Sequence, residues 1–418
     1  MEGDDVQSVE IPPYFLCPIS LQIMKDPVTA VTGITYDRES IQKWLLNSRD
    51  ATCPVTNQPL SRYSDLIPNH TLRRLIQAWC TTSSVDRIPT PTPVLDKPQL
   101  LRLIRSLKNG DVEKAAFAAG LASLEVLGNG VEMNRVLMGK SDVPKLMLEL
   151  LVKCSTKCLI QCVQKCLAVF NLVWSFYWPT QDFEMYIKEN SVELVDHLSA
   201  AALSDGDLSG HALQALKRVL EATCLNKLQL LKVDFISKMV MLLNRNSSRT
   251  QQPTTSIISV LQILIYLSSV GRNRTKITEA GAVRALIELE LSKPPTHKRT
   301  TDLIFGLLSL LCHYVEGREK FLSHPCALAL LAERLLRVSP AVDDQILEII
   351  SLVSKLSGRK EVVAEMLSVG MVSKLCMAMQ ANCADYVKAK ARRVLRRHWS
   401  VWDGSPCVPL YLNTIHHR

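Results

Sequence analysis

The sequence predicts a small α+β module over residues 10–84, followed by an all-α, right-handed solenoid of stacked helical repeats over residues 99–400. Three observations support this fold class. Short extended segments and two helices alternate near the N-terminus, prolines then recur at close intervals, and the remainder shows helical periodicity with a recurring block. With 418 residues, 47% of them hydrophobic, the chain has enough apolar content for two or three domains with sizeable cores.

The N-terminal module starts with two short extended pieces joined by a turn at Thr32-Gly33. Asp37 is predicted to cap the helix that follows. We expect that helix to carry Ile41, Trp44 and Leu45 on one face. After Cys53-Pro54 the chain loops and enters a second helix, whose inward residues are predicted to be Leu72, Leu75, Ile76 and Trp79.

A unit of about 70 residues is only marginally stabilised by one core, and small modules of this shape are often held by zinc. A structural zinc site needs four ligands, usually including closely spaced cysteine pairs. The module has Cys17, Cys53, Cys80 and His70, without such a pair. We therefore predict no metal and no cofactor, and expect hydrogen bonds to support the core, among Asp26, Tyr36, Asp37, Arg38, Glu39 and Asn69.

Four blocks of the module resemble the U-box, the zinc-free relative of the RING finger found in ubiquitin ligases: FLCPISLQIMKDPV, TGITYDRESIQKWL, CPVTNQPL and PNHTLRRLIQAW. The resemblance runs without a gap over residues 10–84 and is far more specific than one short motif. It implies a scaffold that binds a ubiquitin-charged conjugating enzyme (E2). It also implies that no covalent ubiquitin intermediate forms on this chain, so no catalytic residue is assigned.

By position in the U-box motif, the E2-binding surface comprises Ile19 and Leu21 in a first loop, Trp44 on the helix and Pro54 in a second loop. Residue types alone favour core burial for Ile19 and Leu21. The motif favours contact with E2 for Ile19, Trp44 and Pro54 and leaves Leu21 open. Many U-boxes place a cation in the second loop, where it favours the reactive E2–ubiquitin geometry; the matching residue here is the uncharged Asn57, which implies a weaker version of this role.

Cys17 invites the alternative of a catalytic thiol. A nucleophilic cysteine needs a base within hydrogen-bond reach and a lowered pKa. Its neighbours Leu16 and Pro18 provide no base, so we predict that Cys17 is a small buried residue of the module's structure.

The segments around the module are of different character. Residues 1–9 are predicted to be disordered, and residues 85–98 to form a proline-rich linker, with prolines at 89, 91, 93 and 98 favouring polyproline II. Residues 401–418 are predicted to be a C-terminal tail.

The helical region repeats. Aligning blocks on Val143, Val192, Ile236, Val283, Ala327 and Val372 gives steps of 44 to 49 residues, the period of armadillo or HEAT repeats. A long apolar helix lies between successive blocks, and glycines at 271, 317 and 358 are predicted to end such helices. One repeat cannot bury its apolar face alone, so we expect the repeats to stack around a long concave groove.

The block starting at Ile277, IxEAGAVRALIEL, resembles an armadillo repeat. A U-box, a proline-rich spacer and an armadillo array in this order resemble the plant U-box armadillo ligases. That resemblance implies an E3 ubiquitin ligase with substrate held in the groove, acting in plant defence or stress signalling. The alternative is a non-catalytic armadillo adaptor, to which only Asn57 points. An import carrier is disfavoured because Trp174, Trp178 and Trp399 do not recur at the repeat period.

Charge and composition limit the partners and the cellular location expected for the chain. The net charge of +9 permits an acidic partner, but no nucleic-acid motif is present and aromatics make up only 6% of the chain. The polar start is unlike a secretory signal, and 13 cysteines, an odd number, favour reduced thiols in the cytoplasm, with nuclear or peripheral membrane locations left open. No apolar run approaches a transmembrane length. A homo-oligomer remains an open alternative.

Two clusters lie outside these motifs. Cys154, Cys158, Cys162 and Cys166 recur every fourth residue, which on one helix forms a stripe about 18 Å long that no single metal reaches, so packing is favoured over metal binding. A basic cluster, Lys388 to Arg397, fits an acidic or phosphorylated partner or an anionic lipid surface. Its simpler interpretation is a solvated helix face.

Overall fold

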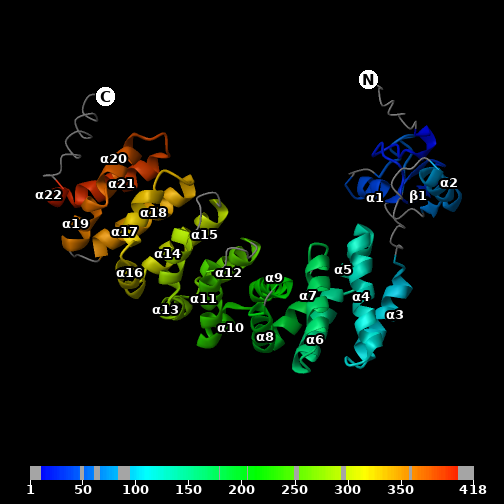
Figure 1. Cartoon of the computed structure of the whole chain (residues 1–418), viewed down its shortest axis with the longest axis horizontal. Helices are drawn as coiled ribbons and strands as arrows, with labels where there is room; N and C mark the ends of the chain where they lie inside the picture. Colours follow the sequence, from blue (N-terminus) through cyan, green and yellow to red (C-terminus); the bar gives the residue numbers. More distant parts are fainter. Residues whose placement is uncertain are drawn as a thin grey trace, which may run out of the picture. The chain divides into compact units, whose positions relative to one another are not determined.

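The computed structural model describes residues 11–47, 51–60, 66–82, 95–177, 179–204, 206–248, 254–292, 298–356 and 360–402. The chain divides into two compact units, Met1–Trp178 and Pro179–Arg418. The first contains a small sheet and helices α1 to α7, and the described residues of the second form helices α8 to α22 (Figure 1). The predicted class, an α+β module followed by an all-helical repeat array, is confirmed.

The N-terminal module is built on a three-stranded antiparallel sheet in the order β2-β1-β3. A 3-10 turn (Pro13–Phe15) precedes β1 (Pro27–Thr29), and β2 (Thr35–Asp37) leads directly into α1 (Arg38–Asn47). The short β3 (Ile67–Pro68) is followed by α2 (His70–Thr82). The turn between β1 and β2 lies where expected, because Gly33 takes a φ of +79° and donates its N–H to the Ala30 carbonyl.

Two expectations about the module's helices are wrong. Asp37 precedes α1, but its carboxylate accepts the N–H groups of Lys25 and Asp26, at 2.8 and 2.9 Å, and so ties the preceding loop to the sheet. On α2, Ile76 and Cys80 form the buried stripe with Leu72 and Trp79 beside it, whereas Leu75 is 53% exposed. The module's core consists of Phe15, Cys17, Met24, Val28, Ala30, Tyr36, Ile41, Leu45, Cys53, Leu60, Ile76 and Cys80.

The helices of the first unit pack as two layers. Helix α3 (Lys97–Asn109) packs on α6 (Val143–Thr156), and α4 (Ala115–Gly130) packs on α7 (Ile160–Trp174). The short α5 (Glu132–Lys140) contacts α4, α6 and α7. These layers are joined by the α6–α7 helical hairpin, which has extensive internal contacts.

In the second unit, α9 (Asp207–Ala222), α12 (Thr254–Leu267), α15 (Lys298–Cys312), α18 (Pro340–Leu356) and α21 (Asp385–Arg397) each pack on the next. We call them the inner layer, because they lie along the inner side of the arc that this unit forms in Figure 1. A second layer packs behind it in the same way, made of α8 (Gln181–Ala202), α11 (Val233–Ser248), α14 (Ala282–Ser292), α17 (Ala327–Arg334) and α20 (Met371–Gln380). The short connecting helices are α10 (Leu225–Gln229), α13 (Gly271–Glu279), α16 (Val315–Leu322), α19 (Lys360–Ser368) and α22 (Trp399–Trp402).

The ends of the helical region differ from the predicted boundaries. Pro98 belongs to α3 rather than to the linker, because proline is tolerated in the first turn of a helix, and Asp96 with Gln99 forms a capping box there. At the other end, Trp402 is fully buried, and its Nε1 donates to the Val363 carbonyl at 3.0 Å, so the first two residues of the predicted tail belong to the array. Residues 1–9, 85–94 and 403–418 lie outside the described residues.

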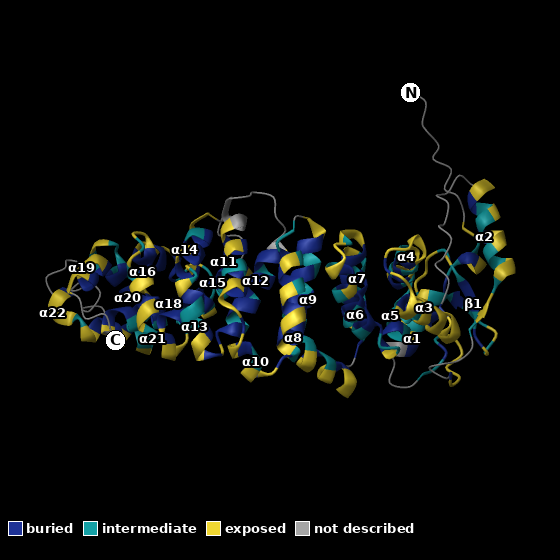
Figure 2. Ribbon diagram, turned by 90° about the horizontal axis from the view of Figure 1, so that it is seen from below, coloured by how far each residue is buried: buried dark blue, intermediate teal, exposed yellow. Residues whose placement is uncertain are grey.

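The repeat register is correct at five of the six aligned positions, all of which are at most 1% exposed: Val143, Ile236, Val283, Ala327 and Val372. Val192 is the exception, at 52% exposed, while its neighbour Ser191 is buried. The block containing Val192 and the segment before it form one continuous helix, α8, with exposed residues along the side visible in Figure 2. The alignment is therefore wrong by one residue in this repeat.

A recurring arginine connects the helices of a repeat, a device the sequence analysis missed. Arg135 donates to the Gly128 carbonyl at the end of α4, Arg274 to the Ser268 carbonyl after α12, and Arg318 to the Cys312 carbonyl at the end of α15. Each arginine lies near the start of a short helix and satisfies a carbonyl that the preceding helix leaves free. The Asn-Arg pair in two of the repeats was the available signal.

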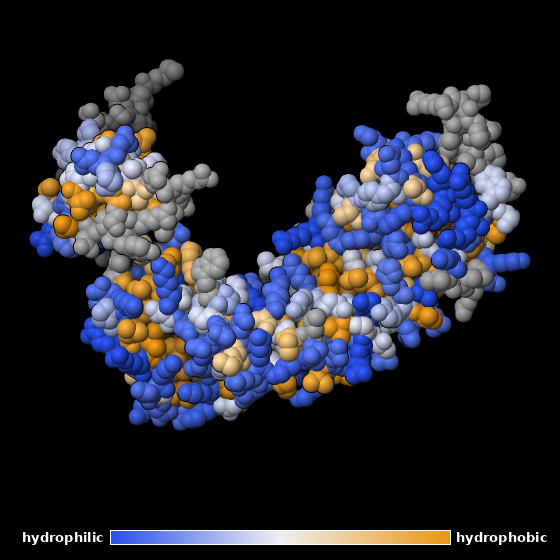
Figure 3. All heavy atoms as spheres, turned by 180° about the vertical axis from the view of Figure 1, so that it is seen from behind, coloured by the Kyte–Doolittle hydropathy of each residue, from blue (hydrophilic) through white to orange (hydrophobic). Residues whose placement is uncertain are grey.

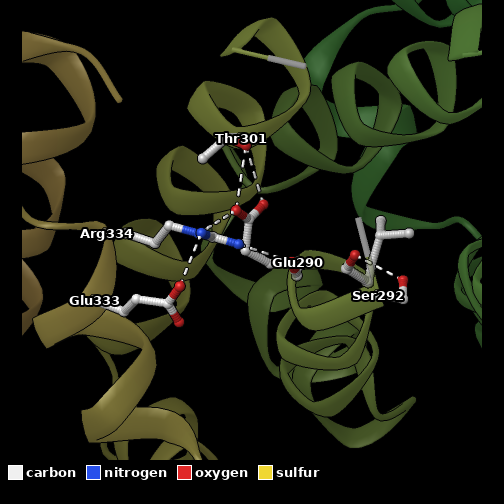
Figure 4. Close-up of polar contacts among 6 residues, drawn as sticks. Glu290, Ser292, Thr301, Glu333 and Arg334 are labelled. Carbon is white, nitrogen blue, oxygen red and sulfur yellow. Dashed lines mark hydrogen bonds and ion pairs between the residues drawn. The ribbon is translucent and has the colours of Figure 1, made fainter. Parts of the chain in front are cut away.

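A buried ion pair joins successive repeats (Figure 4). Arg334 Nε lies 2.8 Å from Glu290 Oε1, and the two side chains are only 8% and 2% exposed. The Thr301 hydroxyl also donates to the Glu290 carboxylate, and Arg334 Nη2 donates to the Glu290 carbonyl. The pair therefore links α14 to the end of α17, with α15 contributing the threonine.

Two of the three glycines predicted to end helices do not do so. Gly271 is the first residue of α13, and Gly317 lies inside α16; Gly358 is outside the described residues. Gly317 is required for a different reason, because a methyl group there would overlap the Leu311 carbonyl oxygen.

Gly317→Ala is therefore expected to lower the free energy of unfolding of the array by roughly 1–3 kcal/mol, since the overlap is with backbone, which cannot rotate away. Gly210→Ala is the control. It also lies inside a helix, but an added methyl group there meets only Ser256 Oγ at 3.7 Å. Alanine at 210 should be neutral or stabilising by up to about 1 kcal/mol. Urea denaturation followed by circular dichroism compares the two, and equal effects would contradict the steric explanation.

Candidate docking surface of the N-terminal module

Two loops of the module share one backbone design, which the repeated letters CPISLQ (17–22) and CPVTNQ (53–58) encode. In the first, Cys17 N donates to the Gln22 carbonyl and Leu21 N donates to the Cys17 carbonyl, both at 2.8 Å. In the second, Cys53 and Asn57 make the equivalent bonds at 2.8 and 2.9 Å. Leu21 and Asn57 occupy the same left-handed position, with φ of +55° and +56°. The sequence analysis missed this repeat.

Each loop is anchored by its cysteine, and both thiols are fully buried. Cys17 Sγ accepts the N–H of Asp37 at 3.2 Å, which joins the first loop to the start of α1. Cys53 Sγ lies 3.0 Å from the Tyr36 hydroxyl and 3.4 Å from the Thr32 hydroxyl. The cysteines thus organise the loops through hydrogen bonds.

The pKa shifts of Cys53, Tyr36 and Cys17 agree with these hydrogen bonds. Burial opposes ionisation of the Cys53 thiol, but hydrogen bonds from Thr32, Thr56 and Tyr36 outweigh it and lower the pKa to about 6. Burial, together with the bond to Cys53, raises the pKa of Tyr36 well above its usual value, so the phenol donates and the sulfur accepts. Burial also opposes ionisation of Cys17, but backbone hydrogen bonds led by Ser20 and Asp37 lower the pKa of its thiol. Its burial leaves it no access to a substrate.

The polar residues expected to support the module lie around the same loops. Arg38 Nε is 2.6 Å from the Asp26 carboxylate, in a pair that is largely shielded from solvent. Asn69 Oδ1 accepts the Leu72 N–H and caps the start of α2. Glu39 is different, because it pairs with Lys43 on the exposed face of α1. It lies outside the supporting network that the sequence suggested.

The two loops and the adjacent face of α1 expose apolar side chains, among polar ones such as Ser20 and Thr56. Leu21 is 74% exposed and Trp44 is 40% exposed, whereas Ile19 and Pro54 are half-buried. Trp44 Nε1 donates to the Thr52 carbonyl at 2.8 Å, which holds the indole against the start of the second loop. Core burial, favoured from residue types alone, is thus wrong for Leu21 and partly right for Ile19, which packs against the core. Val55 is 51% exposed beside Pro54 and was not predicted.

Asn57 is exposed at the tip of the second loop. Asparagine tolerates the left-handed conformation better than most residues, which gives it a local structural reason to be there. The position therefore presents an uncharged amide to solvent, where the first loop presents Leu21.

The cysteines at 154 to 166 are arranged differently from the prediction. The chain reverses at Cys158, which has a φ of +56° and is exposed, so the four residues lie on a helical hairpin and not on one helix. Cys154, on α6, and Cys162 and Cys166, on α7, are buried. Hydrogen bonds from Cys166, and then from Cys162, lower the pKa of Cys154 against the effect of burial. Among the described residues, no group of three or more His, Cys, Asp or Glu side chains is placed to hold a metal ion.

The described part of the chain contains no single helix that is long and apolar enough to cross a membrane. Helices α19 and α20, which are bent by 70° relative to each other, reach the length and apolar composition of a membrane span only when they are counted together.

Comparison with known proteins matches two family descriptions. "U-box domain" matches residues 11–84, and "Plant U-box protein ARM repeat region" matches residues 99–418. Similar curated proteins of Arabidopsis thaliana are E3 ubiquitin-protein ligase PUB24, 36% identical over 98% of this chain and 96% of its own, and PUB23, 33% identical over 96% of each chain. A designed armadillo repeat protein, YIII(Dq)4CqI, aligns with 71% of this chain and 98% of its own at a TM-score of 0.35 and 14% identity, too weak a likeness to support an argument.

Proposed function

The chain belongs to the plant U-box proteins with an armadillo repeat region and is an E3 ubiquitin ligase, and we propose that its two cysteine-anchored loops and Trp44 form the docking surface for a ubiquitin-charged E2. The observation that carries the proposal is the solvent exposure of Leu21 and Val55, on loops that buried hydrogen bonds hold in place, and of Trp44 on α1. Exposed apolar residues on a rigid support are typical of protein interfaces.

The proposed chemistry is positional. Ubiquitin is carried as a thioester on the E2 cysteine, and the amine of a substrate lysine attacks its carbonyl, forming an amide and releasing the E2 thiol. Cys17 and Cys53 are fully buried, which supports a route that does not pass through a thioester on the module. The module contributes by holding the E2 and the substrate close together.

The exposed Leu21 provides the first test. Leu21→Asn gives the first loop the residue that the second loop has at the equivalent left-handed position, so the backbone should be unaffected. We expect the rate of ubiquitin discharge from E2 to free lysine to fall about tenfold, because a central apolar contact is lost. Leu75→Asn is the control, since Leu75 is also exposed, at 53%, but lies on α2 and belongs to neither loop. Equal rates for wild type and Leu21→Asn would contradict the docking surface.

We further propose that the armadillo array holds the substrate on the exposed face of the inner layer, whose helices present partly exposed side chains such as Gln262, Ser309 and Leu352. Substrate capture tests this, with a cross-linker placed at these positions and, in separate variants, on the opposite, outer face. Cross-links recovered only from the outer-face variants would contradict the proposal.

The alternative of a non-catalytic adaptor does not agree with the ligase family of the chain. We propose instead that Asn57 bears on the rate, because an uncharged tip supports the reactive E2–ubiquitin geometry less well than a cation. The discharge assay tests this: Asn57→Arg should raise the rate of discharge, and an unchanged rate would contradict it.

By kinship with the plant ligases, we also propose a role in defence or stress signalling and a cytoplasmic location. Imaging of the tagged full chain in plant cells, with and without an elicitor, tests both. A signal confined to the vacuole or cell wall would contradict the location.

A further inference from the structure

The last inner-layer helix, α21, differs from the others in its charge. Its buried residues, Val387, Ala391, Val394 and Leu395, align with the buried Ile346, Ile350, Val353 and Ser354 of α18 at a constant offset of 41 residues. The register places Arg392, Arg393 and Arg396 on the same face that Ser351, Leu352 and Lys355 occupy in α18. This is the exposed face of the inner layer.

We call Arg392, Arg393, Arg396 and Arg397 the arginine quartet. All four are exposed, and among the described residues none of them pairs with a carboxylate. Lys390, on the same helix, is different: it reaches α18 and pairs with Asp344 at 2.6 Å and Glu348 at 3.1 Å. Two acidic side chains of α18 are therefore already neutralised by another cation, and within the described residues no ion pair compensates the charge of the quartet.

The quartet is compact. Residues four apart lie on adjacent turns of one helix face, about 6 Å apart along the axis, so Arg392 and Arg396, and Arg393 and Arg397, form two neighbouring pairs. Figure 3, in which the C-terminal end of the chain lies at the right, shows hydrophilic surface gathered there. The inner-layer helix α15 has Ser309 and Leu310 at the places of Arg392 and Arg393, whereas α9 has Lys217 and Arg218 there, so α21 differs in carrying four arginines close together.

We propose that the arginine quartet binds an acidic segment, rich in aspartate and glutamate, of the substrate that lies on the inner layer. This inference rests on the proposed function and adds the chemistry of the substrate to it. The guanidinium group is a planar fork that pairs with a carboxylate through two parallel hydrogen bonds, and all four cations of the quartet are arginine.

A substrate segment fits the position better than a membrane does. An extended acidic chain can follow the inner side of an arc, whereas a flat bilayer meets protruding surfaces. A polybasic membrane contact also gains little from arginine over lysine, because it depends mainly on charge near the surface. Trp399, 39% exposed just beyond the quartet, is the feature that a membrane would use, so the test includes vesicles.

The test uses the full chain and the fourfold variant R392Q/R393Q/R396Q/R397Q. The control variant, R105Q/R272Q/K320Q/K360Q, removes the same charge from exposed positions on α3, α13, α16 and α19, outside the inner layer. The probes are a fluorescent 12-residue Asp/Glu peptide, its Asn/Gln analogue, and phosphatidylcholine vesicles containing phosphatidylserine. Binding is followed by fluorescence anisotropy and by co-sedimentation.

We expect the acidic peptide to bind the wild type, its Kd to rise tenfold to about a hundredfold in the quartet variant, and the control to stay within about twofold of wild type. Raising the salt concentration should weaken the wild-type complex. Three results would each overturn the proposal: equal binding of the acidic and neutral peptides, equal loss in both variants, or quartet-dependent binding to vesicles without binding of the acidic peptide.

Ubiquitin discharge from E2 to free lysine is measured on the same proteins. It needs no substrate contact, so the quartet variant should match the wild type. A wild-type chain that fails to discharge the E2 contradicts the docking surface, whatever the peptide does. A wild-type chain that discharges the E2 but does not bind the acidic peptide contradicts only the proposed role of the quartet.

Discussion

Trp44→Ala is expected to reduce ubiquitin discharge from E2 by at least about a hundredfold. The substitution removes the largest exposed apolar side chain beside the two loops, and such anchors carry most of the energy of small interfaces. It also removes the Nε1 donor that holds the Thr52 carbonyl at 2.8 Å, so the second loop loses a fixed point. Single-turnover discharge of a pre-charged E2 to free lysine measures the effect.

Trp44→Phe separates the two contributions, because phenylalanine keeps an aromatic face but donates no hydrogen bond. If Trp44 acts mainly as an anchor, the phenylalanine variant should retain activity within about tenfold of wild type. Equal losses in both variants would show that the bond to Thr52 matters instead. Full activity in Trp44→Ala would remove Trp44 from the docking surface altogether. Far-ultraviolet circular dichroism checks that the helical array is unaffected.

Glu290→Ala is expected to lower the free energy of unfolding of the array by about 3–5 kcal/mol. The alanine leaves the Arg334 guanidinium buried without its carboxylate, and Thr301 loses its acceptor. Most of the loss comes from the charge that remains, not from the attraction that disappears. Urea denaturation at constant pH measures it.

Two further variants sharpen the Glu290 result. Glu288→Ala breaks the exposed pair with Arg284 on the same helix, α14, and should cost no more than about 1 kcal/mol. The double variant E290L/R334M replaces both buried charges by apolar groups of similar size and should recover much of the stability. A double variant as unstable as Glu290→Ala would contradict the explanation by an unpaired buried charge.

Much of the fold was predictable because it follows from local patterns. The turn at Gly33 needed a residue that accepts positive φ, and the repeat period was visible in the spacing of buried residues such as Ile236 and Val283. The errors arose where a long-range contact overrides a local signal. Asp37 stands where a cap belongs, but backbone N–H groups 11 and 12 residues away take its carboxylate.

The candidate site was predictable in outline and less so in detail. Residue type does not separate Leu21, which is exposed, from Ile19, which packs on the core, because both are aliphatic and only the backbone of the loop decides the direction of each side chain. Val55 was missed for the same reason. The prediction that Cys154 to Cys166 lie on one helix was wrong because regular four-residue steps imply a continuous helix, whereas the chain reverses at Cys158.

The paired loops have a consequence for how such a ligase changes over evolutionary time. Their shape is set by backbone bonds and buried sulfurs, to which the tips Leu21 and Asn57 contribute their backbone N–H groups and a positive φ, while the side chains of both tips project into solvent. In the docking surface proposed above, a replacement at either tip would change the side chain offered to the carrier enzyme while the backbone bonds of the loop remain. Selection could then change the pairing one amino acid at a time, within the residue types that accept a positive φ, such as glycine and asparagine.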